Sequence, residues 1–346
     1  MQFTLRPDNM RERAALWLNR SPVPLVQALF GMMGSRVSMA GVRLGVYAAL
    51  AERPYGAVEL AERVGASADG VCLLLDSLCA LHMVRRRGET YVLAPRARRW
   101  LDPRSAQYVG DFLEFNYAQW EWWSSLEDAI RTGRGPAIHD YPPDDPRWDL
   151  YARAMFQLAR VVSPEIVRQI RLHPGAESLL DLGGAHGWFS ASLCERHPSL
   201  RSLVVDLPGA ARAGRRIAER EGYADRVRHL EGDVRSADLG RGRDGVLLFQ
   251  LMHHLTPDEN RNLLAGISHA LKPGALVAVL ELFAPEGGAE ADASTLIGLH
   301  YFLTSSASAY TWPQVDGWLR ESGFRVERRT PVRRLPLQTL VVAQRR

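Results

Sequence analysis

Short apolar runs alternate with amphipathic helical stretches along the second half of the chain. Each run is too short for a buried helix, and such a run is typical of a strand that is covered on both faces. Because strands and helices alternate, the pattern predicts an α/β fold around a doubly wound parallel sheet. Strands are expected at residues 178–182, 202–205, 227–230, 245–249, 275–280, 325–329 and 338–342, with helices at 188–196, 209–221, 258–271 and 313–322.

The N-terminal part follows a different pattern. Apolar residues three and four positions apart predict helices around residues 44–50, 58–64 and 71–81. Residues 84–93 then form two extended pieces about a charged glycine turn, which predicts a hairpin. Helices followed by such a hairpin are typical of a winged helix, so we expect a winged-helix domain over residues 1–103.

A second helical region, residues 104–172, is dense in large aromatic side chains, and a loop with four prolines at residues 133–146 divides it. Aromatic residues at helical spacing usually pack in a core or an interface, although as a group they can also line an apolar pocket. The α/β pattern fills the remaining segment, which is expected at residues 173–346.

The charge of the chain does not indicate a nucleic-acid partner. The formal net charge is +4, yet Lys272 is the only lysine among 43 basic residues, which indicates a compositional bias toward arginine. The candidate recognition helix, residues 70–80, is almost entirely apolar and offers little to phosphates or base edges. The basic residues 85–87 are therefore interpreted as a solvated turn.

Cysteine usage and hydropathy predict a cytoplasmic protein. Cys72, Cys79 and Cys194 are odd in number and form no CxxC pair, so neither a disulfide nor a metal site is expected. No uncharged stretch approaches the roughly 18 residues that a membrane span needs, and charged residues precede the first apolar run. No membrane partner is expected.

Polar residues and glycines follow five successive predicted strands. Because the carboxyl ends of parallel strands meet at one edge of a sheet, these residues are expected to lie together where an open α/β sheet binds its ligand. The positions are Asp181 with Gly183 and Gly187, then Asp206, Asp233, His253 and Glu281.

The acids at this edge favour a nucleoside with a positively charged tail. A dinucleotide loop reads GxGxxG, but Ala185 and Trp188 stand at its second and third glycine positions. Asp206 suits the two hydroxyls of a ribose, and Asp233 follows the next strand, where an adenine could be held. Asp181 suits a cationic group better than a phosphate.

Four motifs carry a family resemblance: LLDLGGAHG at residues 179–187, VVDLP at 204–208, EGD at 231–233 and MHHL at 252–255. In order, they resemble the motifs of S-adenosylmethionine-dependent O-methyltransferases of the plant caffeate and bacterial natural-product type, and the resemblance covers nearly the whole chain. It implies a class I methyltransferase Rossmann-like fold. It also implies that the winged-helix domain forms a homodimer.

The same resemblance implies S-adenosylmethionine as the cofactor and assigns roles by position. His253 matches the catalytic base, and Glu281 matches one of two acids that flank this base in plant members. The cofactor-binding positions that it implies are Asp181, Gly183, Gly187, Asp206, Leu207, Asp233 and Val234.

Several residues depart from the family pattern, and they bear mainly on catalysis. Ala185 replaces the usual middle glycine, and Phe249 stands where plant members have a lysine. His254 and Leu255 replace an Asp–Trp pair, and Trp312 falls near the second acid. Cofactor binding is expected to survive these changes.

A histidine is a suitable base for a phenol. Near neutral pH an imidazole is largely unprotonated, so it can take the phenol proton during methyl transfer, and Glu281 could orient the ring. Because successive strand residues point to opposite faces, only one of His253 and His254 is expected to face the pocket. The sequence favours His253 as the base and leaves its orientation open.

The acceptor is expected to be an apolar aromatic, polyketide-like small molecule of secondary metabolism. Methylation of carbon or nitrogen and non-methylating chemistry (hydroxylation, decarboxylation or cyclisation) remain alternatives, as does a winged-helix regulator that senses a metabolite. The candidate walls of the acceptor pocket are Trp120, Met155, Phe156, Met252, Leu299, His300 and Phe302.

Overall fold

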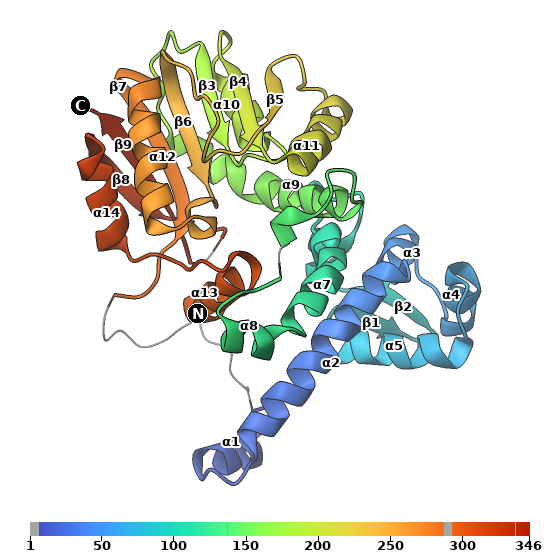
Figure 1. The fold of residues 1–346 in the computed structure, drawn as a ribbon. Coiled ribbons are helices and arrows are strands. Elements are labelled where there is room, and N and C mark those ends of the chain that lie inside the picture. Colours follow the sequence, from blue (N-terminus) through green and yellow to red (C-terminus); the bar gives the residue numbers. More distant parts are fainter. Residues whose placement is uncertain (1–6, 137, 287–292, 336) are drawn as a thin grey trace. The chain divides into compact units, whose positions relative to one another are not determined.

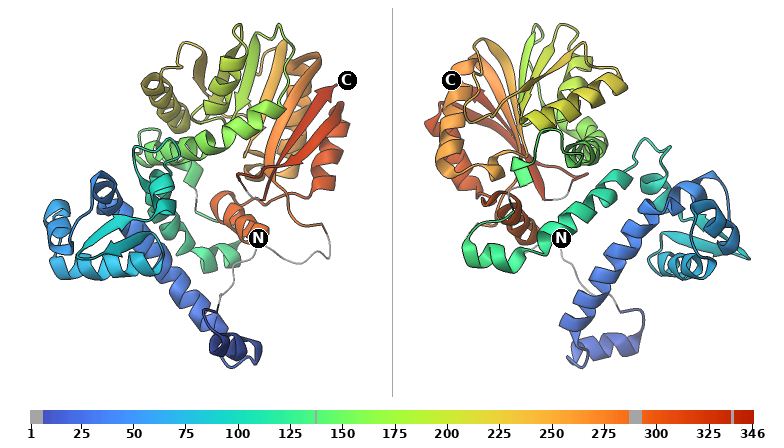
Figure 2. Two further views of the ribbon diagram at one scale, coloured as in Figure 1. Left: turned by 180° about the vertical axis from the view of Figure 1, so that it is seen from behind. Right: turned by 45° about the vertical axis from the view of Figure 1, so that its right-hand side comes forward.

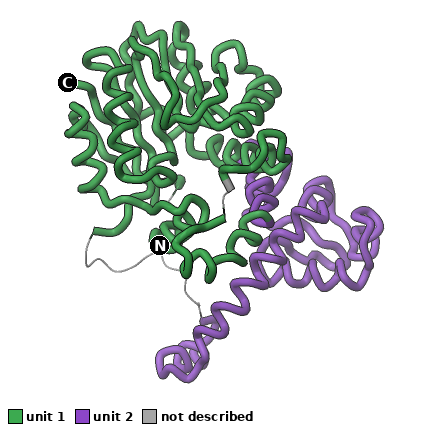
Figure 3. The backbone as a smooth tube through the Cα atoms, in the orientation of Figure 1, with its two compact units in different colours: residues 1, 118–346 green, residues 2–117 purple. Residues whose placement is uncertain are grey.

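The structure, a computed structural model, describes residues 7–136, 138–286, 293–335 and 337–346. The chain forms two compact units, of which one ends at Tyr117 and the other begins at Ala118 (Figure 3). Each unit has its own cluster of buried apolar side chains. The helical segment expected at residues 104–172 is therefore divided between the two units.

The N-terminal unit contains the predicted winged helix. Gly45 has a φ of 73°, and this left-handed residue separates two helices, so the helix expected around residues 44–50 begins at Val46. Val46, Leu60 and Leu75 meet in the core of this unit. Its elements are α1 (Met10–Trp17), α2 (Val23–Arg43), α3 (Val46–Glu52), α4 (Ala57–Val64), α5 (Ala68–Ala80), β1 (Val84–Arg87), β2 (Thr90–Leu93) and α6 (Pro95–Leu101), and α7 (Gly110–Trp123) continues into the second unit.

The second unit is built on a seven-stranded sheet with the order β5-β4-β3-β6-β7-β9-β8 (Figure 1). Neighbouring strands from β5 to β7 run parallel, as predicted. The prediction of a wholly parallel sheet is wrong for the last two strands, because β9 pairs antiparallel with both β7 and β8. The strands are β3 (Ser178–Leu182), β4 (Arg201–Asp206), β5 (Val227–Glu231), β6 (Arg243–Phe249), β7 (Leu271–Leu282), β8 (Phe324–Pro331) and β9 (Gln338–Arg345).

Chain connections explain both the antiparallel pairing of β8 with β9 and the expected location of a ligand crevice. The connection from Pro331 to Gln338 is too short for a parallel crossover, so β8 and β9 form an antiparallel pair. The chain proceeds from β3 outward to β4 and β5 and then returns to place β6 on the other side of β3. Strand order thus reverses beside β3, and a ligand crevice is expected at the carboxyl ends there.

Helices cover both faces of the sheet (Figures 1 and 2). Helices α9 (Arg147–Ile166), α10 (Trp188–Arg196) and α11 (Pro208–Glu221) pack together on one face, while α12 (Pro257–Ala270) and α14 (Trp312–Glu321) lie on the other. The remaining segments are α8 (Leu126–Thr132), α13 (Ala293–Ser305) and the short 3-10 turns η1 (Ile138–Asp140), η2 (Val167–Gln169) and η3 (Met252–His254). Within the described ranges, no helix has both the length and the apolar character that crossing a bilayer requires.

Candidate functional site

A cavity of about 380 Å³ lies at the carboxyl ends of β3, β4, β5 and β6. Its lining includes five of the seven positions predicted to bind the cofactor, namely Gly183, Asp206, Leu207, Asp233 and Val234. We call Gly183, Asp206 and Asp233 the strand-end rim. His139, His254 and Ser305 line the same cavity, and we call these three residues the imidazole wall.

Asp206, the last residue of β4, presents a carboxylate to the cavity. The backbone N–H of Ala185 donates to Oδ2 at 2.8 Å, and that of Leu207 donates to Oδ1 at 2.7 Å. Each oxygen keeps further acceptor capacity, because an ionised carboxylate has about four lone-pair sites. Burial raises the pKa of Asp206 to about 6, so the group is charged at neutral pH. It can therefore accept both hydroxyl hydrogens of a diol.

Asp181 lies beneath the glycine loop and is not among the lining residues. It is 2% exposed, accepts a hydrogen bond from Ser190 Oγ at 2.7 Å, and has a pKa raised by burial to about 7. Gly184 covers it so closely that a Cβ there would come within 2.4 Å of the Asp181 carboxyl carbon. Asp181 thus supports the loop from below, and its direct contact with the cofactor stays a prediction.

Gly187 also lies outside the lining. It has a φ of 67° immediately before α10, and a Cβ there would come within 2.8 Å of Val227 on β5. A larger residue is therefore excluded by both backbone conformation and packing. The contact with the cofactor implied for Gly187 stays a prediction as well.

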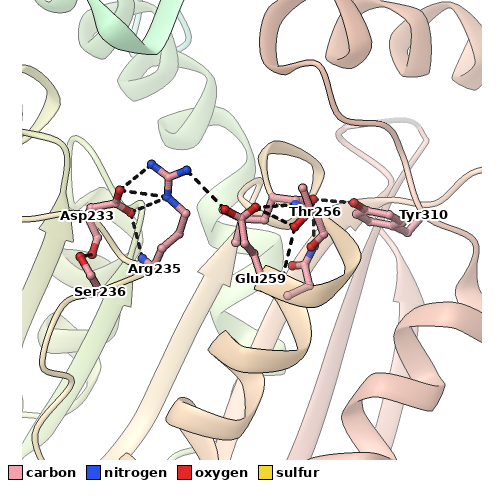
Figure 4. A network of polar contacts seen from close by, with 8 residues as sticks. Asp233, Arg235, Ser236, Thr256, Glu259 and Tyr310 are labelled. Carbon is pink, nitrogen blue, oxygen red and sulfur yellow. Dashed lines mark hydrogen bonds and ion pairs between the residues drawn. The ribbon is translucent and has the colours of Figure 1, made fainter. Parts of the chain in front are cut away.

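Asp233 is part of a polar network at the far end of the rim (Figure 4). Arg235 donates from Nη2 to Asp233 Oδ2 at 2.6 Å and from Nη1 to Glu259 Oε1 at 3.4 Å. The guanidinium holds the pKa of Asp233 below its usual value, so this carboxylate is charged. Arg235 itself lines the cavity and was not singled out from the sequence.

His253 is buried against Glu281, the acid that the sequence paired with it. Nδ1 of the ring lies 2.9 Å and 3.1 Å from the two carboxylate oxygens of Glu281 on β7. The ring also stacks on Tyr301 of α13, with centroids 3.5 Å apart. The arrangement fixes the ring and leaves Nε2 without a hydrogen-bond partner among the described residues.

The two adjacent histidines do not lie on a strand, so the expectation that strand alternation separates them is wrong. Strand β6 ends at Phe249, Gln250 takes a positive φ of 53°, and His253 and His254 fall in the 3-10 turn η3. Their ring centroids are 4.1 Å apart. His254 lines the cavity, whereas His253 is 3% exposed beside Glu281 and is not part of the lining.

His254 and His139 are joined through one hydroxyl. Ser305 Oγ hydrogen-bonds Nδ1 of His254 and lies 3.4 Å from Nε2 of His139. The two rings meet edge to face, with centroids 4.6 Å apart. Burial lowers the pKa of His139 to about 4 and that of His254 well below its usual value, with the nearby His253 as a further cause. Both rings are therefore neutral at neutral pH.

The residues predicted to wall the acceptor pocket lie outside the described lining of this cavity. Met252 is 1% exposed in the sheet core, and Phe156 packs edge-on against Trp188 with centroids 5.4 Å apart. Both are packing residues in this structure. His300 stacks on Trp123, with centroids 6.1 Å apart. For Trp120, Met155, Leu299, His300 and Phe302, contact with the acceptor stays a prediction.

Sequence reasoning missed two of the three residues of the imidazole wall, His139 and Ser305. His139 and Ser305 come from the loop before α9 and the end of α13, segments without strand-end periodicity. The available signal for His139 was its place in a long proline-rich loop, since such loops are often functional. Nothing in the sequence distinguished Ser305 from other serines.

Comparisons with known proteins place the chain in a family. Residues 123–325 match the model of the O-methyltransferase domain, and residues 26–103 match that of the O-methyltransferase dimerisation domain. The tetracenomycin polyketide synthesis 8-O-methyl transferase of Streptomyces glaucescens is 31% identical, over 90% of this chain and 94% of its own length. The 3-hydroxy-5-methyl-1-naphthoate 3-O-methyltransferase of Streptomyces sahachiroi is 27% identical, over 87% and 89%.

Solved structures show the same fold. Human N-acetylserotonin methyltransferase in complex with S-adenosylmethionine has a TM-score of 0.81 at 21% identity, over 99% of both chains. An O-methyltransferase family protein from Burkholderia thailandensis has a TM-score of 0.82 at 24% identity, over 94% of this chain and 98% of its own. Fold and site define an S-adenosylmethionine-dependent methyltransferase. The chain belongs to the O-methyltransferase family.

Proposed function

We propose that this enzyme methylates a phenolic or enolic hydroxyl of an aromatic natural product, with His253 as the general base. The observation that carries the proposal is the His253–Glu281 pair, with Nδ1 within 2.9 Å of a carboxylate oxygen and Nε2 without a described partner. Relatives that methylate a polyketide and a hydroxynaphthoate, by their names, support an aromatic acceptor.

The residues of the rim fit S-adenosylmethionine. Asp206 keeps acceptor capacity for a ribose diol, Asp233 lies one strand further along, and Gly183 presents no side chain to the cavity. The acids also complement a positive charge. When bound, the cofactor supplies an electrophilic methyl group on a sulfonium, which needs an aligned and deprotonated nucleophile.

His253 supplies the deprotonation in this mechanism. Nδ1–H donates to Glu281, which fixes the tautomer with Nε2 unprotonated and facing away from the acid. Nε2 takes the proton of the acceptor hydroxyl, and Glu281 stabilises the imidazolium that results. Tyr301 holds the ring in place by stacking. A positioned base of this kind contributes roughly 10² to 10⁴ in rate.

Transfer of a labelled methyl group tests the proposal. The enzyme is incubated with S-adenosylmethionine labelled in its methyl group and with 1-naphthol or 1-naphthylamine, and products are identified by mass spectrometry. We expect the methyl ether of the naphthol and no methylated amine, and His253→Gln should slow formation of the ether by about 10² to 10⁴. The exposed His269 provides the matched control, His269→Gln, which should keep wild-type activity. Label on carbon or nitrogen, or cofactor binding without transfer to any hydroxylated aromatic, contradicts the proposal.

We also propose that the N-terminal unit forms a homodimer through α1 and α2. Trp17, Leu25 and Phe30 are 84%, 62% and 62% exposed, and exposed apolar patches of this kind mark interaction surfaces. The match to the dimerisation domain begins at residue 26. Sedimentation of Phe30→Glu should give a monomer, while Leu230→Glu, at an exposed position on β5, should remain dimeric. A dimeric Phe30→Glu would contradict this interface.

A further inference from the structure

The glycine loop, residues 183–187, is held by two side chains from another part of the chain. Tyr223, just after α11, donates its hydroxyl hydrogen to the carbonyl of His186 at 2.7 Å. Nε2 of His229 on β5 lies 3.0 Å from the carbonyl oxygen of Ala185. We call Tyr223 and His229 the loop clamp. Neither residue is among those that line the cavity, and nothing in the proposed methyl transfer uses either side chain.

The contact with the loop determines the tautomer of His229. A carbonyl oxygen can only accept, so Nε2 of His229 carries the ring hydrogen and Nδ1 carries none. Nδ1 is buried and has no hydrogen-bond partner among the described residues. Burial lowers the pKa of His229 to about 4, so the ring is neutral at neutral pH. The only polar contact of this ring in the described structure is therefore the one with the loop.

Ala185 is the residue of the loop that most needs such a contact. It has a φ of 35°, a conformation that costs free energy for a residue with a Cβ and that glycine adopts readily. Its N–H donates to Asp206 Oδ2 at 2.8 Å, while its carbonyl accepts from His229. The two hydrogen bonds hold the backbone of Ala185 on both sides of its Cα atom. They also link His229 to the carboxylate at the end of β4.

Two glycines leave the space that this contact occupies. A Cβ at Gly214 of α11 would come within 1.9 Å of the Ala185 carbonyl oxygen and within 2.8 Å of His229 Nε2. A Cβ at Gly187 would come within 2.8 Å of Val227 and within 3.4 Å of the same nitrogen. Larger residues at either position would displace the imidazole or the loop. The hydrogen bond is thus built into the packing of the loop, α11 and β5.

We propose that the loop clamp holds Ala185 in its strained conformation, so that the N–H of Ala185 keeps the carboxylate of Asp206 oriented for the ribose of the cofactor. His229 acts through Ala185, and Tyr223 holds the next carbonyl of the loop. Both are positioning residues for cofactor binding. The inference rests on the proposed fit of Asp206 to the ribose and is independent of His253 as the base.

Binding of S-adenosylhomocysteine, measured by calorimetry without an acceptor, tests the clamp. His229→Phe keeps a ring but loses the donor, and we expect it to raise Kd by about 3- to 10-fold, the value of one neutral hydrogen bond. His229→Gln, whose amide nitrogen can take the place of Nε2, should stay near the wild-type Kd. Tyr223→Phe removes only a hydroxyl and should also raise Kd. The matched control is His269→Phe, at an exposed position of α12, which should bind like wild type.

Two double variants separate positioning from general support of the fold. In an Asp206→Asn background, His229→Phe should add little to Kd, because its effect passes through that carboxylate. Ala185→Gly added to His229→Phe should recover affinity, because glycine takes a positive φ without strain. In turnover assays His229→Phe should raise the KM for S-adenosylmethionine and keep kcat at saturating cofactor. A variant that only loses stability would show a lower free energy of unfolding with an unchanged Kd, and that result overturns the proposal.

Other outcomes also decide against the clamp. Effects of His229→Phe and Asp206→Asn that simply add, or no recovery with Ala185→Gly, overturn the proposed path through Ala185. If His229→Phe does not fold, a wild-type Kd in Tyr223→Phe, or a nitrogen-15 NMR spectrum that places the hydrogen of His229 on Nδ1, overturns it as well. If Asp206→Asn binds S-adenosylhomocysteine like wild type, the ribose assignment and the clamp both fail. The labelled-methyl experiment judges His253 separately, because calorimetry uses no acceptor.

Discussion

The strand-end rim and the imidazole wall line one cavity but arise in different ways. Each rim residue lies at or just beyond the carboxyl end of a parallel strand, and strand pairing alone brings these ends together. The wall combines a turn after β6, a loop before α9 and the end of α13. The sheet therefore positions one side of the cavity, whereas loops and helices outside the sheet position the other residues of its lining.

The largest expected effect comes from the proposed base, His253, which lies in the turn η3 next to His254 and outside the cavity lining. His253→Gln should lower kcat by about 10² to 10⁴, because the acceptor proton then has no base. Binding of S-adenosylhomocysteine, measured by calorimetry, should change little, since the rim is intact. A variant with wild-type kcat would show that the acceptor loses its proton elsewhere, for example at His254.

Asp206→Asn tests the rim alone. A hydrogen bond to a charged group contributes about 1.5–3 kcal/mol, and the amide of the variant keeps one acceptor oxygen, so loss of one such bond should raise the Kd of S-adenosylhomocysteine by about 10- to 150-fold. The matched control is Asp258→Asn, whose carboxylate is 91% exposed and pairs with Arg261 on the surface. Equal affinities for the two variants would contradict the assignment of Asp206 to the ribose.

Gly184→Ala tests whether the rim depends on the close packing beneath its loop. A Cβ at 2.4 Å from the Asp181 carboxyl carbon must displace that side chain, so we expect the free energy of unfolding to fall by about 1–3 kcal/mol. In Gly317→Ala the new methyl group has open space within α14, and helix propensity should make that variant more stable by roughly 0.5–1 kcal/mol. Chemical denaturation measures the free energy of unfolding of both variants. If both substitutions change it in the same direction, the packing argument is wrong.

The smallest expected effect is a pH dependence of the rim. Because the pKa of Asp206 is raised to about 6, cofactor affinity should fall as the pH drops below 6, by up to tenfold per unit. The same raised pKa makes the folded state without cofactor bind more protons than the unfolded chain between roughly pH 4 and 6. The contribution of Asp206 to stability therefore decreases as the pH rises through this range, while affinity increases.

Both trends should be absent from Asp206→Asn. Calorimetric titration measures the affinity, and denaturant unfolding measures the stability, each at several pH values. The quantity to compare is the difference between wild type and variant at each pH. An affinity that is flat from pH 5 to 8 in the wild type would contradict a raised pKa for Asp206.

The features that could be predicted are those that a local sequence pattern determines. Every strand predicted from apolar runs is present, and the acids after β4 and β5 line the cavity because parallel strands end together. The antiparallel direction of β9 was missed because the strand–helix alternation was extended to the last two strands, although their short connection favours an antiparallel pair. The histidine turn was missed because strand alternation was applied to His253 and His254, although the predicted strand already ends at residue 249.

The acceptor side was less predictable for a physical reason. Aromatic residues at helical spacing serve packing as readily as binding, and Phe156 and Met252 are used for packing. His139 and Ser305 meet only through tertiary contacts between segments 166 residues apart. A single sequence carries no signal for such a tertiary contact, so the imidazole wall can be recognised only in the folded structure.

The start of α12 has a consequence beyond its own helix (Figure 4). Glu259 closes the capping box with Thr256 and also accepts from Arg235, while the buried Asn260 donates to the carbonyl of Met252 in the histidine turn at 2.9 Å. The start of α12 is therefore linked by hydrogen bonds to Asp233 of the strand-end rim, through Arg235, and to the turn that contains His253. A substitution that loosens the start of α12 is therefore expected to disturb the strand-end rim and the histidine turn together.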